Sequence, residues 1–425
     1  MKITLLKGSP KEIAVAGTLG CTSTKSSAEI LTDLQSLDEL SRNQKCENVL
    51  KNSFGRGHGA VGDQANFTFS LSDVTRLTTL FLCQSPFTSF LQQSMRHVKA
   101  GGYRLPESLS SKKYAKDIVE KAFELYFKMV EGGIPEEDAR YVLPLCSTTN
   151  IQMNVNARGL CQLSAMARSE NVGDQAKEII SDISCYKETW ELMNDYGPNY
   201  EPLSFYPAPD LFGESDILVK GGVWDNCTNF SGYVIALLSK EELRDGIKNR
   251  KLHILSTLKH VHFTFGVGLS LAAFHQAVRQ RTWDHCVETL ANAAKQDNSV
   301  VIPPSIASSE FVNEFVDLHC EMVVSYREMI NHGIPKYDAF NLIPHSLKIY
   351  DLIHINGWNA IHSLGKRCCS CAQWEIRGIA NKAKQTIKDQ YPELGRYVGP
   401  QCLTYGVCPE NKSCGMVEKF KKEGK

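Results

Sequence analysis

The sequence predicts an α+β protein built from two tandem copies of one domain, and three observations support this prediction. The stretch 129–144 aligns with the stretch 329–344 at a constant offset of 200 residues, with the same Gly-Ile-Pro and Asp-Ala strings in both. A Phe-Thr-Phe triplet precedes each block, at 67–69 and at 263–265. Long segments with apolar residues at helical spacing occur in both copies. Because similarity at a fixed offset is the signature of a duplicated unit, strands and helices are expected twice.

Each expected element follows from its local pattern. The Phe-Thr-Phe triplets alternate apolar and polar residues, which is typical of a half-buried strand. Helices are expected over 113–130, 311–330 and 372–391, where apolar residues recur on one face. The first two helices end at Gly133 and Gly333. Each glycine is followed by Ile-Pro, which suits a helix end and then the start of another helix.

The repeat also sets the expected domain boundaries. We expect a first copy at 1–206, a linker at 207–222, a second copy at 223–400 and a tail at 401–425. The linker contains several proline and glycine residues, which favour turns. The tail is basic and rich in cysteine.

The composition excludes several classes of partner. Lys plus Arg and Asp plus Glu both number 47, so the formal net charge of the 425 residues is zero. Proteins that bind nucleic acid or anionic membranes over a wide surface are usually basic, so we expect neither partner. Any bound anion must then be held by local arginines. The segment 1–7 has no sustained apolar run, and the most apolar stretch, 263–278, is shorter than the ~20 residues of a membrane helix. The prediction is a soluble, cytoplasmic protein.

One polar motif lies after the strand of the second copy. Gln276 and Arg279 lie three residues apart on one helix face, and Arg281 follows them. Paired arginine forks suit a phosphate group, although a solvated helix surface is the plainer interpretation. In the first copy we take 92–99 as the equivalent stretch, which contains Gln93, Arg96 and His97.

A second polar motif combines Gln373 and Arg377, four residues apart on one helical face. Polar residues inside apolar helical segments need partners, which are either each other or a ligand. The remaining members of this group are Asn356, Trp358, His362 and Arg367 in the second copy, and Asn156, Arg158, Gln162, Arg168 and Gln175 in the first.

Together these motifs resemble the flavin-dependent thymidylate synthase family. The string Ala-Gln-Trp-Glu-Ile-Arg at Ala372–Arg377 is fairly specific to the family. The segment 138–144, which reads Asp-Ala-Arg-Tyr-Val-Leu-Pro, and the segment Val155–Arg158 match the family closely. The segment 57–69 is similar to the family's Gly-His segment ahead of its strand. The resemblance covers most of the chain, once per copy, and implies an antiparallel sheet packed with helices in each.

The resemblance also implies an activity. Members of this family transfer the carbon of methylenetetrahydrofolate to C5 of dUMP and so form dTMP. Reduced FAD is the hydride source, and NADPH or another donor reduces the flavin. No cysteine or serine nucleophile is required, so the protein would act by positioning and electrostatics. Similar members are homotetramers with sites shared between subunits, so a tandem chain is expected to form a homodimer that mimics the tetramer.

Neither copy carries the full set of family residues, and the losses look complementary. The first copy reads Arg96-His97-Val98 and keeps Arg140, whereas the second reads Arg279-Gln280-Arg281 and has Phe340. We therefore expect composite sites. The resemblance implies that Arg140, Arg279 and Arg367 are catalytic. It implies that the substrate is bound by the same three arginines together with Gln93, Gln276, Arg281 and Arg377. It implies that the flavin is bound by His58, Arg96, His97, Asn156, Arg158, Gln162, Asn356 and His362.

Two other functions remain open. The altered serine-containing segment and the lost second arginine leave room for a sister enzyme that modifies C5 of another pyrimidine nucleotide. The other is a flavin- or nucleotide-binding paralogue without turnover. Complementary loss argues against the paralogue, because drift would erode the two copies independently.

The cysteines suggest a metal site. The chain has 15 cysteines, and Cys402, Cys408 and Cys414 are evenly spaced in a Gly- and Pro-containing tail. Cys371 is available as a fourth ligand. Such a thiolate set suits zinc or an iron–sulfur cluster, and a plain reduced loop is the alternative.

Overall fold

The computed structural model describes residues 1–85, 87–168, 172–196, 211–212, 239–249, 252–280, 282–296, 299–406, 408 and 413–422. The predicted linker at 207–222 lies outside the described residues except for 211 and 212, and Arg281 also lies outside them. The chain divides into two compact units. Unit 1 contains Met1–Ala208 and Pro303–His345, and unit 2 contains Pro209–Ile302 and Ser346–Lys425.

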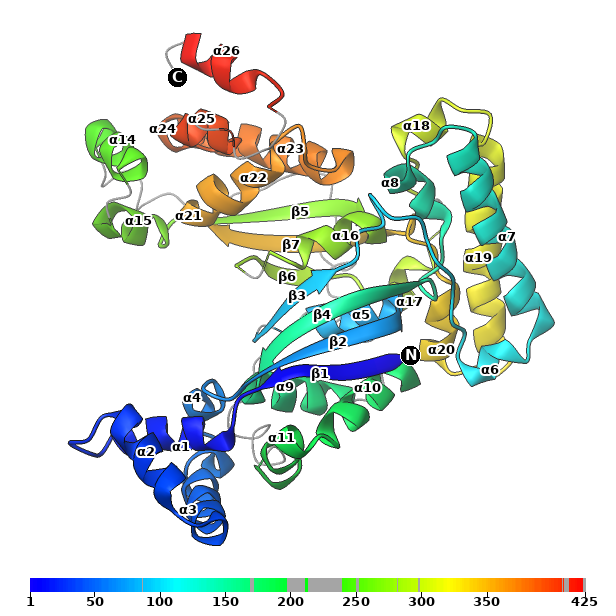
Figure 1. Ribbon diagram of the computed structural model, residues 1–425. Coiled ribbons are helices and arrows are strands. Elements are labelled where there is room, and N and C mark those ends of the chain that lie inside the picture. The colour runs from blue at the N-terminus through cyan, green and yellow to red at the C-terminus, as the bar shows by residue number, and fades with distance from the viewer. Residues whose placement is uncertain are drawn as a thin grey trace. The chain divides into compact units, whose positions relative to one another are not determined.

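Unit 1 is built on a four-stranded antiparallel sheet (Figure 1). The alternation predicted from Phe-Thr-Phe is confirmed, because Phe67, Phe69 and Leu71 are fully buried on one face of the second strand. The strand order is β1–β2–β4–β3, with β1 at Lys2–Gly8, β2 at Asn66–Thr75, β3 at Thr88–Gln92 and β4 at Thr148–Asn156.

Helices connect and flank this sheet. Along the chain they are α1 (Lys11–Gly20), α2 (Ser27–Ser36), α3 (Glu39–Asn52), η1 (Phe54–Arg56), α4 (Gly59–Gly62), α5 (Arg76–Cys83), α9 (Ala157–Ala167), α10 (Asp174–Ser184), α11 (Lys187–Trp190) and the π-helix η3 (Glu191–Tyr196). Helix α9 begins at the end of β4 and α5 at the end of β2, so both helices start where a central strand stops.

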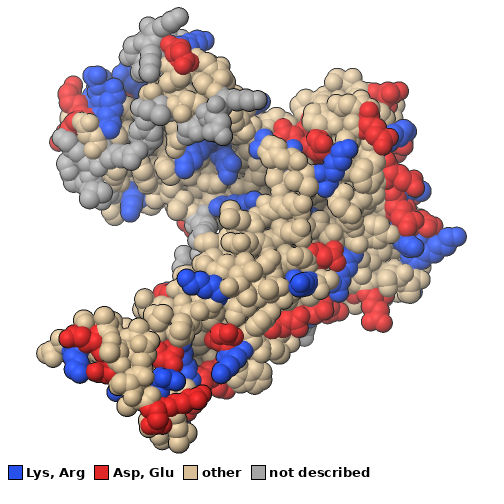
Figure 2. Space-filling view, in the orientation of Figure 1, with Lys and Arg blue, Asp and Glu red and all other residues tan. Residues whose placement is uncertain are grey.

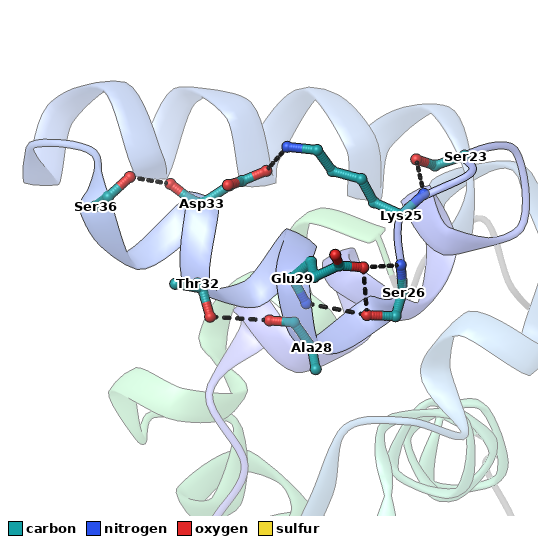
Figure 3. Close-up of polar contacts among 8 residues, drawn as sticks. All are labelled: Ser23, Lys25, Ser26, Ala28, Glu29, Thr32, Asp33 and Ser36. Atoms are coloured by element: carbon teal, nitrogen blue, oxygen red, sulfur yellow. Dashed lines mark hydrogen bonds and ion pairs between the residues drawn. The ribbon is translucent and has the colours of Figure 1, made fainter.

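Helix α2 shows how strongly a local sequence signal defines a helix start. The Ser26 hydroxyl accepts a hydrogen bond from the Glu29 amide at 3.3 Å, and the Glu29 carboxylate accepts one from the Ser26 amide at 2.7 Å (Figure 3). This reciprocal capping box satisfies two amides that the helix itself leaves unpaired. The hydrogen bonds from the Ser26 side chain and backbone lower the pKa of Glu29.

A helical subassembly in unit 1 combines the repeated blocks of both copies. Its long helices are α7 (Lys113–Glu131) and α19 (Val312–Asn331), close to the bounds predicted from sequence. The contacts are reciprocal: Ser108 donates to Asp338, and Ser305 donates to Asp138. The shorter helices are α6 (Glu107–Ser110), α8 (Glu136–Ala139), η2 (Arg140–Val142), α18 (Pro304–Ala307), α20 (Lys336–Ala339) and η6 (Phe340–Leu342).

The backbone repeats this reciprocity between the two blocks. The Leu145 amide donates to the Ile343 carbonyl at 2.8 Å, and the His345 amide donates to the Leu143 carbonyl at 3.0 Å. This exchange, with the packing of α7 on α19, places residues 303–345 in unit 1. The compact units therefore differ from the two copies at 1–206 and 223–400, because the middle of the second copy packs on its counterpart in the first.

Unit 2 contains a three-stranded antiparallel sheet. Its order is β5–β7–β6, with β5 at His262–Ser270, β6 at Asp284–Val287 and β7 at Lys348–Asn356. The helices are α14 (Lys240–Lys248), α15 (Leu252–Leu258), α16 (Leu271–Ala277), α17 (Leu290–Ala293), α21 (Gly357–Asn359), the π-helix η7 (Ala360–Leu364), α22 (Gly365–Arg367), α23 (Trp374–Gln390), α24 (Pro392–Gly395), α25 (Gln401–Tyr405) and α26 (Met416–Lys422).

The α+β fold class, with antiparallel sheets packed by helices, is thus confirmed in both units. Figure 2 shows lysine and arginine interspersed with aspartate and glutamate on the face in view, in keeping with a formal net charge of zero. Within the described part of the chain, none of the helices has the length and apolar character needed to cross a bilayer.

Candidate functional site

Unit 1 holds a pair of arginines, one of which is buried. Arg140 lies in η2 and is only 5% exposed. Its Nε donates to the Glu137 carbonyl at 2.9 Å, and its Nη2 is buried with no hydrogen-bond partner among the described residues. Arg96 forms an ion pair with the Glu137 carboxylate. A buried guanidinium with an unused donor is costly unless a ligand completes it, so this pair is the strongest anion-binding candidate in unit 1.

The electrostatics agree with this interpretation. Burial lowers the pKa of Arg140, and the nearby positive charge of Arg96 lowers it further. Arginine nevertheless keeps its proton at neutral pH. The neighbouring Tyr141, Glu137 and Asp138 act in the opposite direction and raise the pKa of Arg140, so burial is the main cause of the lowered pKa.

The structure corrects the alignment of the two copies around the first polar motif. Thr75 caps α5 at the end of β2, just as Ser270 caps α16 at the end of β5. Strands β3 and β6 then pair at matching register with β4 and β7, Ser89 opposite Asn154 and Asp284 opposite His354. Counting between these fixed points makes 84–86 the counterpart of 279–281.

The stretch 92–99 therefore follows β3 and is not the equivalent of the Gln276 motif. Sequence alone misled here because the match rested on residue type: Arg96 follows β3, whereas Arg279 precedes β6. Gln93, which follows β3, is exposed, and its backbone amide donates to the Asn150 carbonyl at 2.9 Å. His97 is exposed.

Two of the residues expected to bind flavin in unit 1, Asn156 and Arg158, contact Asp63. The Asn156 side chain donates to Asp63 at 2.9 Å and accepts from the Gly159 amide at 2.7 Å, which caps α9. Arg158 forms an ion pair with Asp63 at 3.3 Å, and its guanidinium lies 4.0 Å from the ring centre of Phe87. Each polar group thus has a structural partner.

Asp63 itself was missed by the sequence analysis, which chose His58 from the same segment. The sequence contained a signal for Asp63, because it is the single acidic residue between Gly57 and Phe69 and lies shortly before β2. In the structure His58 is exposed and Gln162 is fully buried in α9.

Unit 2 holds the other polar motif. The Nε2 of Gln276, in α16, is buried and has no hydrogen-bond partner within the described residues. Arg279 follows the helix and is exposed. The two residues therefore present an amide and a guanidinium next to each other along the chain, where one ligand could use both.

The other polar residues singled out in the second copy, from Asn356 to Arg377, lie in or next to helices α21 to α23. Asn356 caps α21 by accepting from the Asn359 amide at 2.9 Å, and the rings of Trp358 and His362 stack at 5.4 Å. Arg377 donates to the Ser370 carbonyl at 2.6 Å, which fixes it to its own helix start. Arg367 ends α22 and is half-buried.

The metal site at the late cysteines stays a prediction. Within the described residues, no group of three or more His, Cys, Asp or Glu side chains is placed to hold a metal ion. Burial, and then the neighbouring Cys369, Cys408 and Cys414, raises the pKa of the Cys402 thiol. The set of Cys371, Cys402, Cys408 and Cys414 therefore stays a prediction, and none of the four is in a disulfide among the described residues.

Comparison with known proteins agrees with these features. The model of the family described as thymidylate synthase complementing protein matches residues 3–184 and 238–393. A flavin-dependent thymidylate synthase of Geobacter sulfurreducens is 33% identical over 39% of this chain and 74% of its own length. One of Sulfurisphaera tokodaii is 29% identical over 44% of this chain and 74% of its own length.

A solved UMP/dUMP methylase of Streptomyces cacaoi, bound with 5-Br dUMP, superposes with a TM-score of 0.38 at 18% identity, covering 46% of this chain and 95% of that chain. The family match falls in two segments that correspond to the two copies of the repeat. The chain therefore belongs to the thymidylate synthase complementing protein family, the flavin-dependent thymidylate synthases, as a tandem two-copy member.

Proposed function

We propose that this chain methylates dUMP at C5 to give dTMP, with methylenetetrahydrofolate as carbon donor, FAD as cofactor and NADPH as reductant. The observation that carries the proposal is the buried guanidinium of Arg140 beside Arg96, whose Nη2 has no hydrogen-bond partner among the described residues. A nucleotide phosphate or the carbonyl edge of a uracil supplies the acceptor that this guanidinium lacks. The family of the chain supports the choice of dUMP and flavin.

The residues present fit such ligands. Arg140 and Arg96 offer donors to a phosphate or a uracil carbonyl, and Gln276 has both a donor and an acceptor, as the imide edge of uracil requires. Arg279 is exposed and so accessible to a phosphate, and Arg367 is assigned to the nucleotide by the family resemblance. When bound, the reduced flavin supplies the hydride of the reaction.

The work of the protein in this proposal is to bind and orient. Asn156 and Arg158 in unit 1, and Asn356 and His362 in unit 2, would hold the flavin. Arg140 would neutralise charge on the nucleotide. No nucleophilic residue is assigned, in line with the buried cysteines: burial raises the pKa of Cys161 to about 12, so this thiol is protonated at neutral pH.

The direct test is an assay with purified protein. We expect a yellow protein that oxidises NADPH only when dUMP is present and that forms dTMP only when methylenetetrahydrofolate is added as well. Chromatography of the nucleotides identifies the product. Turnover of UMP or dCMP in place of dUMP would assign a sister activity, and tight flavin binding without any turnover would reduce the chain to a binding protein.

We further infer that the active form is a homodimer, because the repeat duplicates a domain that resembles subunits of a tetramer. Light scattering coupled to size exclusion is expected to give a mass of about twice 47.4 kDa for the flavin-loaded protein. A monodisperse monomer that retains its flavin and turns over dUMP would contradict this expectation.

A further inference from the structure

We infer that Glu375 is a positioning residue, which sets the helix that carries Gln276 and leads to Arg279. This inference rests on the proposed function, because it concerns the same nucleotide-binding motif. Glu375 acts through Ser270, the residue that caps α16. All of the residues involved belong to unit 2.

Glu375 reaches the start of α16 with both carboxylate oxygens. Its Oε1 accepts a hydrogen bond from the Ser270 amide at 2.7 Å, and its Oε2 accepts one from the Ser270 hydroxyl at 2.6 Å. Ser270 is fully buried and Glu375 is 8% exposed. Hydrogen bonds to a charged group in such surroundings are about twice as strong as neutral ones, so this contact fixes the Ser270 side chain in one orientation.

The orientation of Ser270 decides where α16 begins. With its proton donated to Glu375, the Ser270 hydroxyl accepts from the Ala273 amide at 3.0 Å and caps the helix. Helix α16 spans only Leu271–Ala277, so every residue in it lies within two turns of this cap. A change in the cap therefore moves Gln276 and the chain that continues to Arg279.

Glu375 is itself held in place by the helix that carries it. Gln373 caps α23 by accepting from the Glu375 amide at 3.0 Å and from the Ile376 amide at 3.1 Å. The buried Gln373 and Glu375 thus form a relay from the start of α23 to the start of α16. Both come from the Ala-Gln-Trp-Glu-Ile-Arg string, which gives that string a positioning role besides any contact with ligand.

The first copy contains the same device with different chemistry, which supports the assignment. There Gln175, at the same offset of 200 residues, accepts from the Thr75 amide at 3.0 Å and from the Thr75 hydroxyl at 2.8 Å. Thr75 caps α5 as Ser270 caps α16. An amide oxygen can therefore replace the carboxylate in this geometry, provided that it reaches the cap.

The test compares substitutions of Glu375 in the flavin-loaded full chain. We expect Glu375→Ala to raise the Kd for dUMP by roughly tenfold or more, since a displacement of about 1 Å in a site can cost on the order of a hundredfold. The Glu375→Gln variant should retain most of the affinity. The double variant Glu375→Gln/Ser270→Thr, which installs the pair found in the first copy, should come closest to the wild type.

Two controls separate positioning from general stability. Asn381→Ala changes an exposed residue on the same α23 helix and should alter neither affinity nor exchange. Hydrogen exchange of the α16 amides, measured without nucleotide, should speed up in Glu375→Ala while the amides of β7 remain protected. A KM for dUMP that rises more than kcat falls would further distinguish misplaced binding residues from partial unfolding.

The outcomes separate this inference from the proposed function. Faster exchange in α16 with rescue by the double variant supports the relay even if the wild-type protein fails to bind dUMP, which would refute the proposed function alone. Unchanged exchange and unchanged dUMP affinity in a folded Glu375→Ala protein would overturn the relay. So would a double variant that is as impaired as Glu375→Ala.

Discussion

Replacing Arg140 by alanine is expected to weaken dUMP binding or turnover by roughly 30-fold or more. The physical reason is that Arg140 is buried and offers an unused Nη2, so a bound nucleotide gains a desolvated, charge-assisted contact. Loss of such a contact typically costs about 2–5 kcal/mol, and 1.4 kcal/mol corresponds to tenfold. The measurement is the Kd for dUMP by titration, followed by kcat/KM.

Two variants make this result interpretable. Arg140→Lys keeps the charge and loses the planar fork, so we expect an intermediate loss of affinity with a normal melting temperature. Arg56→Ala removes an exposed arginine that contacts Asn52 and should leave dUMP binding unchanged. If Arg140→Ala is folded and binds dUMP like the wild type, Arg140 has a purely structural role.

The same assay tests whether both copies serve one reaction. Arg367→Ala in the second copy is expected to impair the turnover of dUMP as Arg140→Ala does, and the double variant should be little worse than either single variant. Additive losses would indicate independent effects. Loss confined to Arg367→Ala would make the first copy a scaffold.

The regular elements were predictable because their signals are local. Helices α7, α19 and α23 lie within a few residues of the bounds expected from apolar periodicity, and both Phe-Thr-Phe triplets lie in strands. The duplication was predictable from the constant offset. The grouping of residues 303–345 with unit 1 was not, because it depends on which apolar helix faces meet, and periodicity does not specify the partner of a face.

The candidate site was predictable only in part, for the same physical reason. Arg140 was found from its motif, but its burial and unused donor depend on the surrounding packing. The equivalence of 92–99 with the second-copy motif failed because it rested on residue type, and residue type does not show that one stretch follows β3 while the other precedes β6. Glu375 was overlooked in favour of its neighbours Gln373 and Arg377, since nothing in the sequence reveals that a carboxylate will reach Ser270 across 105 positions.

The second large expected effect concerns a buried charged residue, Asp351, on the otherwise apolar face of β7. Asp351 lies in the middle of β7, where its side chain is fully buried, and its Oδ2 lies 2.6 Å from Nδ1 of His285 on β6. The His285 side chain is 3% exposed and packs against the rings of Phe274 and Trp283. Burial opposes the charged imidazole, but the Asp351 carboxylate outweighs it, and the pKa of His285 is raised.

Asp351→Asn is expected to destabilise the protein by about 3–5 kcal/mol at pH 6, because removing one member of a buried ion pair strands the other. The pKa of His285 is higher in the folded chain than the 6.5 of an unfolded one, so the pair stabilises fully below pH 6.5 and loses this contribution as the pH rises through the folded value. The destabilisation should therefore be smaller at pH 9 than at pH 6. Urea unfolding at both pH values measures it, with Asp182→Asn, at an exposed position, as control.

The first copy supplies the decisive variant for this pair. At the corresponding register positions it has Phe90 and Ile151, which are apolar. Replacement of a buried ion pair by apolar residues of similar size is often neutral or stabilising by about 1–4 kcal/mol. We therefore expect His285→Phe/Asp351→Ile to unfold at a urea concentration equal to or above that of the wild type, and to lose the pH dependence between pH 6 and pH 9 that Asp351→Asn reveals. A double variant as unstable as Asp351→Asn would show that the shape of the pair, and not its buried charge, holds β6 against β7.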